Sequence, residues 1–293
     1  MRFHPILLLS ASLGALPLEA QDHPAPLGRP ARVIDGIPAP ESVALGPDRA
    51  WYVSSFGEFD VKGDGAVYRV DPEKGTREKY ATGLDDPCGL LFLGDTLWVA
   101  DRGGVYRIQR GRAELVYAAK DFPRTLHFLN DLAAGPQGTM YVSDTGDSTD
   151  TGHGAVFLLG RGKRPTVVPG SDTVAAQSSV NGLLPGKGDS LYAVGFRTGV
   201  LSVTDGRGSW KDLARNLGAA DGVDLVPGGA LYVSDNGGGN LYLIPRTGRS
   251  RPVKVASGLE APADLVVDRE RGVLVVPENS ANRLSVFRLN QSR

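Results

Sequence analysis

The sequence predicts an all-β protein, and three observations support this. First, 39 glycines and 20 prolines make up about a fifth of the 293 residues, where about 12% is usual. Both residues disfavour helix interiors, so a helical bundle or coiled coil is excluded. Second, 41% of the residues are hydrophobic and 22% are charged, which allows a sizeable core and argues against disorder. Third, short apolar segments that alternate at period two recur along the chain.

One strand-like phrase, which usually carries an aromatic residue and closes on a small or acidic one, occurs six times. It reads AWYVSS at 50–55, TLWVAD at 96–101, TMYVSD at 139–144, SLYAVG at 190–195, ALYVSD at 230–235 and VLVVPE at 273–278. A second strand precedes each phrase. These preceding strands open at Glu41, Cys88, Asn130, Asn181, Asp221 and Ala263, at intervals of 40 to 51 residues.

A third strand follows each phrase, and a fourth follows in the first five units. The third strands are AVYRV at 66–70, GVYRI at 104–108, AVFLL at 155–159, VLSVT at 200–204, NLYLI at 240–244 and RLSVF at 283–287. Four short antiparallel strands per unit are typical of a β-propeller blade, so we expect one domain of six blades. The sixth unit lacks a fourth strand, and ARVIDG at 31–36 resembles it. We therefore expect the N-terminal strand to complete the last blade.

Residues 1–20 have the pattern of a signal peptide, with Arg2 before an apolar stretch and a small residue, Ala20, at the end. We expect an exported protein, periplasmic or secreted, cleaved near Ala20; an uncleaved hydrophobic N-terminus is the alternative. Residues 21–30 would be a linker and 31–293 the propeller. No later segment approaches the ~18 apolar residues of a membrane span.

Charge and cysteine content narrow the possible partners. The formal net charge is −1 with no long basic run, so nucleic acid is not an expected partner. Cys88 is the only cysteine, which excludes an intrachain disulfide and a cysteine-based metal cluster. We expect a monomer that acts on a small molecule.

The six residues that open the preceding strands point to a metal site. In a propeller the first strand of each blade lines the central shaft, so these residues meet at one mouth. Four of them carry oxygen: Glu41, Asn130, Asn181 and Asp221. Calcium binds six to eight such oxygens, which leaves positions for water or substrate. We expect Ca²⁺ there, with Zn²⁺, Mg²⁺ or Mn²⁺ as alternatives; otherwise these side chains only bind water and backbone within the shaft.

The residues that close the repeated phrase should reach the same rim. Asp101, Asp144 and Asp235 are therefore candidates for substrate binding, although aspartates at such positions also cap tight turns. Arg102 and Arg197 follow this column and are candidates for contact with an anionic substrate; the alternative is a solvated surface. Two long loops, 56–65 and 145–154, are candidates for a lid. His127 and His153 are either proton shuttles near the mouth or ordinary surface residues.

Six blades opened in this way resemble the SMP-30/gluconolactonase/LRE-like family of sugar-lactone lactonases. The residues that carry the resemblance are PESVAL, LNDLAAGPQGTMYVSD, VNGLLPGKGDSLYAVG and DGVDLVPGGALYVSD, and it extends over roughly 31–289. It implies calcium-dependent hydrolysis with Glu41, Asn181 and Asp221 as metal ligands. It also implies Asn130 as a fourth ligand or substrate contact and Asp221 as the catalytic base.

Related calcium-dependent phosphotriesterases and paraoxonase-like lactonases look similar at this level. One position departs from the sugar lactonases: Phe128 stands where they often carry an arginine, two residues before the first asparagine. A more apolar lactone or ester is therefore as compatible with the sequence as a sugar-acid lactone.

The mechanism implied is metal-assisted hydrolysis, in which the cation polarises the carbonyl. Asp221 either activates water or attacks directly, and both routes stay open. The sequence contains no G-x-S-x-G nucleophile motif and no G-x-x-x-x-G-K-[ST] phosphate loop. The competing hypothesis is a non-catalytic propeller that binds a ligand or another protein, because this fold hosts many functions.

Overall fold

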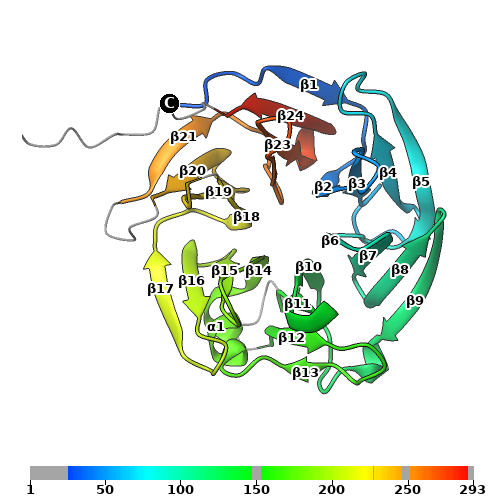
Figure 1. Cartoon of the computed structure of the whole chain (residues 1–293), viewed down its shortest axis with the longest axis vertical. Helices are drawn as coiled ribbons and strands as arrows, with labels where there is room; N and C mark the ends of the chain where they lie inside the picture. The colour runs from blue at the N-terminus through cyan, green and yellow to red at the C-terminus, as the bar shows by residue number, and fades with distance from the viewer. Residues whose placement is uncertain (1–25, 147–152, 227, 246–250, 290–293) are drawn as a thin grey trace, which may run out of the picture.

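Figure 1 shows the protein as a ring of β-sheets around a central axis, in a computed structural model. The structure describes residues 26–146, 153–226, 228–245 and 251–289. Within them, strands form six four-stranded antiparallel sheets, which confirms the all-β, six-bladed prediction. The expected signal peptide, with its cleavage point at Ala20, lies outside the described residues. No helix in the described ranges is long and apolar enough to cross a membrane.

Each blade is one sheet whose strands run outward from the axis in chain order. The first three blades are β2 (Pro40–Leu45), β3 (Trp51–Ser55), β4 (Gly65–Val70) and β5 (Arg77–Leu84); β6 (Leu90–Leu93), β7 (Thr96–Asp101), β8 (Gly104–Gln109) and β9 (Arg112–Ala118); and β10 (Leu129–Ala134), β11 (Met140–Asp144), β12 (Ala155–Leu159) and β13 (Thr166–Val167).

The last three blades follow the same order. They are β14 (Val180–Pro185), β15 (Leu191–Gly195), β16 (Val200–Thr204) and β17 (Trp210–Ala214); β18 (Ala220–Leu225), β19 (Leu231–Asp235), β20 (Asn240–Ile244) and β21 (Val253–Ser257); and β22 (Val266–Asp268), β23 (Val273–Glu278) and β24 (Arg283–Arg288), with β1 (Arg32–Asp35) outermost. The repeat therefore predicted the strand positions closely.

Two inner strands begin later than the repeat indicated. In the second blade β6 starts at Leu90, two residues after Cys88, and in the sixth β22 starts at Val266, three after Ala263. Both earlier residues still bond to the neighbouring strand, because the N–H of Cys88 donates to Ala100 O and that of Ala263 to Pro277 O. These hydrogen bonds hold the chain beside the neighbouring strand at the two places where the regular inner strand has not yet begun.

In the part of the chain that the structure describes, four short helical segments connect strands. They are the α-helix α1 (Ser171–Ser178), between β13 and β14, and the 3-10 turns Ala119–Asp121, Pro136–Gly138 and Asn279–Ala281. The repeat analysis did not predict α1. It lies in the longest interval of the repeat, the 51 residues from Asn130 to Asn181.

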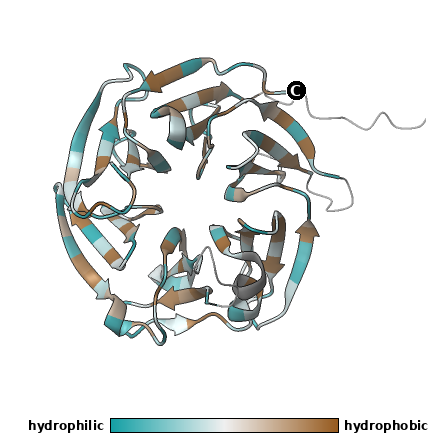
Figure 2. Ribbon diagram, turned by 180° about the vertical axis from the view of Figure 1, so that it is seen from behind, coloured by the Kyte–Doolittle hydropathy of each residue, from teal (hydrophilic) through white to brown (hydrophobic). Residues whose placement is uncertain are grey.

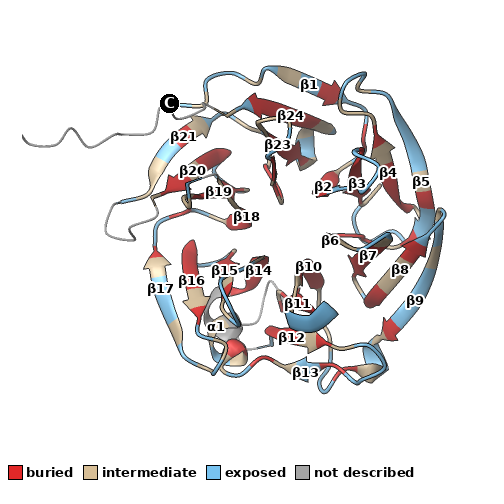
Figure 3. Ribbon diagram, in the orientation of Figure 1, coloured by how far each residue is buried: buried red, intermediate tan, exposed pale blue. Residues whose placement is uncertain are grey.

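The hydrophobic core lies between neighbouring blades. Tyr52, from the aromatic column of the repeated phrase, packs edge-to-face against Tyr80 of its own blade and Phe92 of the next, with ring centroids 5.0 Å apart in both pairs. Hydrophobic residues follow the strands in Figure 2, and hydrophilic ones gather in loops and at the periphery. Exposed residues occur mainly on outer strands such as β5, β9 and β17 (Figure 3). Burial between six sheets thus holds the inner strands around the axis.

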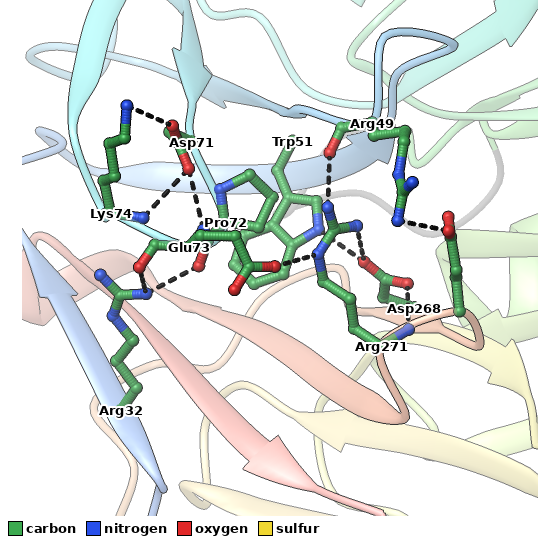
Figure 4. Close-up of polar contacts among 10 residues, drawn as sticks. Arg32, Arg49, Trp51, Asp71, Pro72, Glu73, Lys74, Asp268 and Arg271 are labelled. Atoms are coloured by element: carbon green, nitrogen blue, oxygen red, sulfur yellow. Dashed lines mark hydrogen bonds and ion pairs between the residues drawn. The ribbon is translucent and has the colours of Figure 1, made fainter.

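The N-terminal strand closes the ring. β1 pairs with β24 in antiparallel register, so the two ends of the chain meet in the sixth blade, as predicted. Side chains join this blade to the first (Figure 4). The indole N–H of Trp51 donates to Asp268 Oδ2 at 2.9 Å, and Arg271 bonds both Asp268 and Glu73 at 3.0 Å. Arg32 of β1 donates to the carbonyl of Glu73 at 2.8 Å.

Candidate active site

The four predicted metal ligands occupy the same place in four inner strands. Glu41, Asn130, Asn181 and Asp221 are the second residues of β2, β10, β14 and β18. Each lies where the pairing with the next strand shifts register. The shifts fall between Pro40 and Val43, Leu129 and Leu132, Val180 and Leu183, and Ala220 and Val223. A bulge re-aims the side chain it carries, so the four share one geometry.

Serines of the repeated phrase hold three of these bulges. The hydroxyls of Ser54, Ser143 and Ser234 each accept a hydrogen bond from the backbone N–H that follows a predicted ligand, at 2.8 to 2.9 Å. Ser143 and Ser234 also donate to a carbonyl of the next blade, Asn181 O and Ala263 O. A bulge leaves backbone N–H groups without a ladder partner, and burying one unpaired costs free energy. The serine therefore satisfies the bulge and links adjacent blades.

A cavity of about 700 Å³ opens over these bulges. Its lining includes all four predicted ligands, Glu41, Asn130, Asn181 and Asp221, together with aromatic and polar residues from the rim. The side chains of all four residues are almost fully buried. The structure thus brings together, at one place on the axis, the set that the sequence singled out.

Each of the four side chains keeps one buried oxygen without a hydrogen-bond partner. In the described residues seven buried side-chain atoms lack such a partner, and four of them are Glu41 Oε2, Asn130 Oδ1, Asn181 Oδ1 and Asp221 Oδ1. Leaving one buried polar atom unpaired costs about 1–3 kcal/mol. Four such atoms in one cavity fit a hard cation, which takes carboxylate and amide oxygens as ligands.

The charges at the site also fit a cation. Burial, and then the neighbouring carboxyl of Asp221, raises the pKa of Glu41 well above its usual value. Burial, and then the charge of Asp264, raises the pKa of Asp221 in the same way. Within the described residues no group of three or more His, Cys, Asp or Glu side chains is placed to hold a metal. A metal here would therefore depend on the two asparagines as well as on Glu41 and Asp221.

Asp101, Asp144 and Asp235 do not line this cavity. Their carboxylates accept backbone hydrogen bonds of 2.8 to 3.1 Å from the loop that leads into the inner strand of the same blade. The donors are Asp85 and Asp86 for Asp101, His127 and Phe128 for Asp144, and Ala219 for Asp235. These three carboxylates thus make the contacts of the turn-capping alternative.

The residue after each closing position forms a ring that the sequence analysis largely missed. All six such residues line the cavity: Phe56, Arg102, Thr145, Phe196, Asn236 and Asn279. Successive side chains of a strand point to opposite sides, so when the closing residue turns into the loop, its successor faces the axis. That alternation was the available signal. It would have added Phe56, Thr145, Phe196, Asn236 and Asn279 to Arg102, the one member of this ring that the sequence had indicated.

The two predicted arginines have different environments. The guanidinium of Arg102 lies over the rings of Phe59 and Phe128, 5.1 and 5.7 Å from their centroids, and pairs with Asp60 and Asp86. Arg197 also lines the cavity and makes a 3.4 Å hydrogen bond to Ser179. Arg197 therefore remains a candidate for substrate contact, whereas the charge of Arg102 is engaged by protein groups.

The two histidines lie together. The rings of His127 and His153 stack with centroids 4.8 Å apart and an interplanar angle of 8°. His127 lines the cavity. Part of the loop 145–154, with its acidic residues at 147 and 150, falls outside the described residues.

Fold and site together define a class of protein: a six-bladed propeller with a cavity on its axis, lined by four buried side chains that each keep one unpaired oxygen. Within that class, the chain belongs to the SMP-30/gluconolactonase/LRE-like family, whose model matches residues 48–273. The sequence has no significant match among curated proteins.

Solved structures of similar fold include a gluconolactonase from Xanthomonas campestris, with 16% identity, a TM-score of 0.69 and coverage of 92% of this chain and 96% of that one. A luciferin-regenerating enzyme has 13% identity, a TM-score of 0.70 and coverage of 89% and 96%. Regucalcin from Agrobacterium tumefaciens, a calcium-binding protein, has 14% identity, a TM-score of 0.67 and coverage of 87% and 92%. At these identities the likeness shows the fold.

Proposed function

We propose that the protein is a divalent-cation-dependent hydrolase of lactones or related esters, with Ca²⁺ as the preferred cation. The observation that carries the proposal is the set of four buried, partnerless oxygens in one cavity. Two of them belong to carboxyl groups and two to amides, the hard donors that calcium selects over softer metals. Membership of a family that includes gluconolactonases favours lactone chemistry.

A bound divalent cation would polarise the substrate carbonyl and stabilise the negative charge that develops on its oxygen. The residues of the chain would hold the cation, exclude water and activate the nucleophile. Asn130 and Asn181 present neutral amide oxygens, which hold a cation without adding charge. The burial of Glu41, Asn130, Asn181 and Asp221 keeps bulk water away from their polar groups, which strengthens the electrostatic interactions there.

In this proposal Asp221 activates the nucleophile, which is a water molecule. Its Oδ1 is buried in the cavity and free of protein partners, so this oxygen can bind and orient water or accept its proton. Attack of water on the carbonyl carbon breaks the ring or ester C–O bond, and the leaving oxygen takes up a proton. The products are a hydroxy acid from a lactone, or an acid and an alcohol from an ester.

The test combines metal content with activity. Purified protein is analysed for bound metals and then assayed on lactones, carboxylic esters and phosphotriesters, before and after EDTA. We expect calcium-restored hydrolysis of lactones or esters, and a loss of at least about 100-fold in Asp221→Asn. Glu114→Gln, an exposed carboxylate on β9 paired with Arg107, is the charge control.

A protein that binds no divalent metal and hydrolyses none of these substrates would be the ligand-binding propeller of the competing hypothesis. Hydrolysis of phosphotriesters but of neither lactones nor carboxylic esters would keep the metal site and reject the substrate class.

A further inference from the structure

One side of the cavity is lined by a continuous group of phenylalanines, which we call the aromatic wall: Phe56, Phe59 and Phe128. The rings of Phe56 and Phe59 lie 5.8 Å apart between centroids, and those of Phe59 and Phe128 lie 5.9 Å apart. All three line the cavity that holds the predicted ligands, and Phe128 is two residues before Asn130. The wall therefore borders the place where a substrate carbonyl would bind.

Phe59 is unusual because it is 60% exposed although it belongs to this wall. It lies in the loop between β3 and β4, and that loop is tied to the second blade. Asp86 accepts the N–H of Asp60 at 2.9 Å, and Asp85 accepts the N–H of Gly63 at 3.0 Å. A large apolar ring held in place at a cavity mouth is a pre-formed contact for an apolar group.

Arg102 holds the wall together. Its guanidinium lies over both Phe59 and Phe128, and it pairs with Asp60, the neighbour of Phe59, and with Asp86 at 3.1 Å. Two carboxylates thus offset its charge, and its planar face covers two rings. This arrangement makes Arg102 a positioning residue for the wall.

The opposite chemistry is found on the rim of the last two blades, where Asn236 and Asn279 line the same cavity. The rim of the cavity is thus amphipathic, with the aromatic wall toward the first and third blades, Phe196 toward the fourth, and amides toward the fifth and sixth. A polyhydroxylated sugar lactone would place hydroxyl groups against phenyl rings, which offer them no hydrogen bonds. A substrate with one apolar arm satisfies both sides.

We propose that the aromatic wall binds an alkyl or aryl arm of the substrate, so that the protein acts on lactones or esters with such an arm in preference to sugar lactones. This inference rests on the proposed hydrolase function. Phe59 is its specificity-determining residue.

The first test compares kcat/KM for δ-valerolactone, δ-decanolactone and D-glucono-δ-lactone in the calcium-loaded protein. We expect δ-decanolactone to exceed δ-valerolactone by at least about tenfold, the effect of burying two methylenes, and D-glucono-δ-lactone to be poorest. In Phe59→Ala this preference for the alkyl arm should fall by about tenfold. Val61→Ala, an exposed apolar residue of the same loop that does not line the cavity, should keep it.

Arg102→Met tests the positioning role. It removes the ion pairs but keeps an apolar side chain, so we expect a raised KM for δ-decanolactone with kcat little changed, and a smaller change in KM for δ-valerolactone. Preference for D-glucono-δ-lactone, or an unchanged preference for the alkyl arm in Phe59→Ala, would overturn the proposal.

A second readout separates this proposal from the hydrolase function. The non-hydrolysable lactam analogue of δ-decanolactone and the unsubstituted lactam are each titrated into the protein, and their affinities are measured by calorimetry. We expect at least about tenfold tighter binding of the alkyl lactam, lost in Phe59→Ala. If neither lactones nor carboxylic esters are hydrolysed but this difference is found, the proposed function fails and the apolar subsite stands. Equal binding of the two lactams would reject the subsite whatever the activity.

Discussion

The hydroxyl of Ser234 accepts a 2.8 Å hydrogen bond from the backbone N–H of Gly222, the residue after Asp221. The same hydroxyl donates to the carbonyl of Ala263 in the next blade at 2.8 Å. One side chain thus holds the bulge that aims Asp221 into the cavity and fixes its distance from the neighbouring blade. Ser54, Ser143 and Ser234, which recur at the same place in the repeated phrase, thus stabilise the bulges that carry the site residues.

Replacing Ser234 with alanine should loosen that support. We expect Ser234→Ala to lower the free energy of unfolding by about 1–3 kcal/mol, because the N–H of Gly222 is left buried and unpaired. Calcium affinity should fall as well, since Asp221 loses its fixed direction. Denaturant unfolding and calcium titration measure the two effects. Ser190→Ala, in an exposed turn, is the control. Full calcium affinity in Ser234→Ala would show that the bulge is held by other contacts.

The junction between the first and last blades should depend on pH. Burial alone would raise the pKa of Asp268, but hydrogen bonds from Trp51 and Arg271 outweigh it and lower the pKa. A carboxyl with a lowered pKa in the folded state stabilises the protein above its unfolded pKa of about 4, and this contribution is lost as pH falls through the folded value.

Asp268→Asn should therefore lower the free energy of unfolding by about 2 kcal/mol near neutral pH. The difference from the wild type should shrink below about pH 4. Asp212→Asn, which removes an exposed pair with Arg215, should change stability by about 0–1 kcal/mol. Denaturant unfolding at several pH values measures both. A difference that persists unchanged in acid would contradict the role given to the ionised carboxylate.

Export remains a prediction from residues 1–20. We expect the mature chain to begin at Gln21 when the full sequence is expressed with its secretion machinery, because the apolar stretch ends on the small residue Ala20. Intact-mass measurement of the mature protein and its recovery outside the cytoplasm test this. Arg replacements at Leu8 and Leu9 should block processing. A mature chain that retains residues 1–20 would support the uncleaved alternative.

The repeat in the sequence predicted the blades because each strand shows the period-two pattern and each blade reuses it. It also predicted that Glu41, Asn130, Asn181 and Asp221 lie together, since residues at equivalent places in a ring meet at one level, and all four line one cavity. The bulges were not predicted. A bulge requires no particular residue type. The residues that follow the four predicted ligands share no common pattern, since they are Ser42, Asp131, Gly182 and Gly222.

Two other features could not be predicted from the sequence, for physical reasons. The α-helix Ser171–Ser178 joins two blades and carries no strand pattern, so the repeat does not predict it. The aromatic wall combines Phe56 and Phe59 with Phe128, which is about 70 residues away in the chain. Such a group forms only when the first and third blades have taken their places in the ring of six.

Calorimetric titration of Ca²⁺ into the cation-free wild type and Asp221→Asn would show whether Glu41, Asn130, Asn181 and Asp221 form a cation site. We predict one site in the wild type and at least about 100-fold weaker binding in the variant. Removing a buried charge should leave the cation-free variant at least as stable as the wild type, so misfolding would not explain the loss. No binding by the wild type, or equal affinity in the two proteins, would contradict the account.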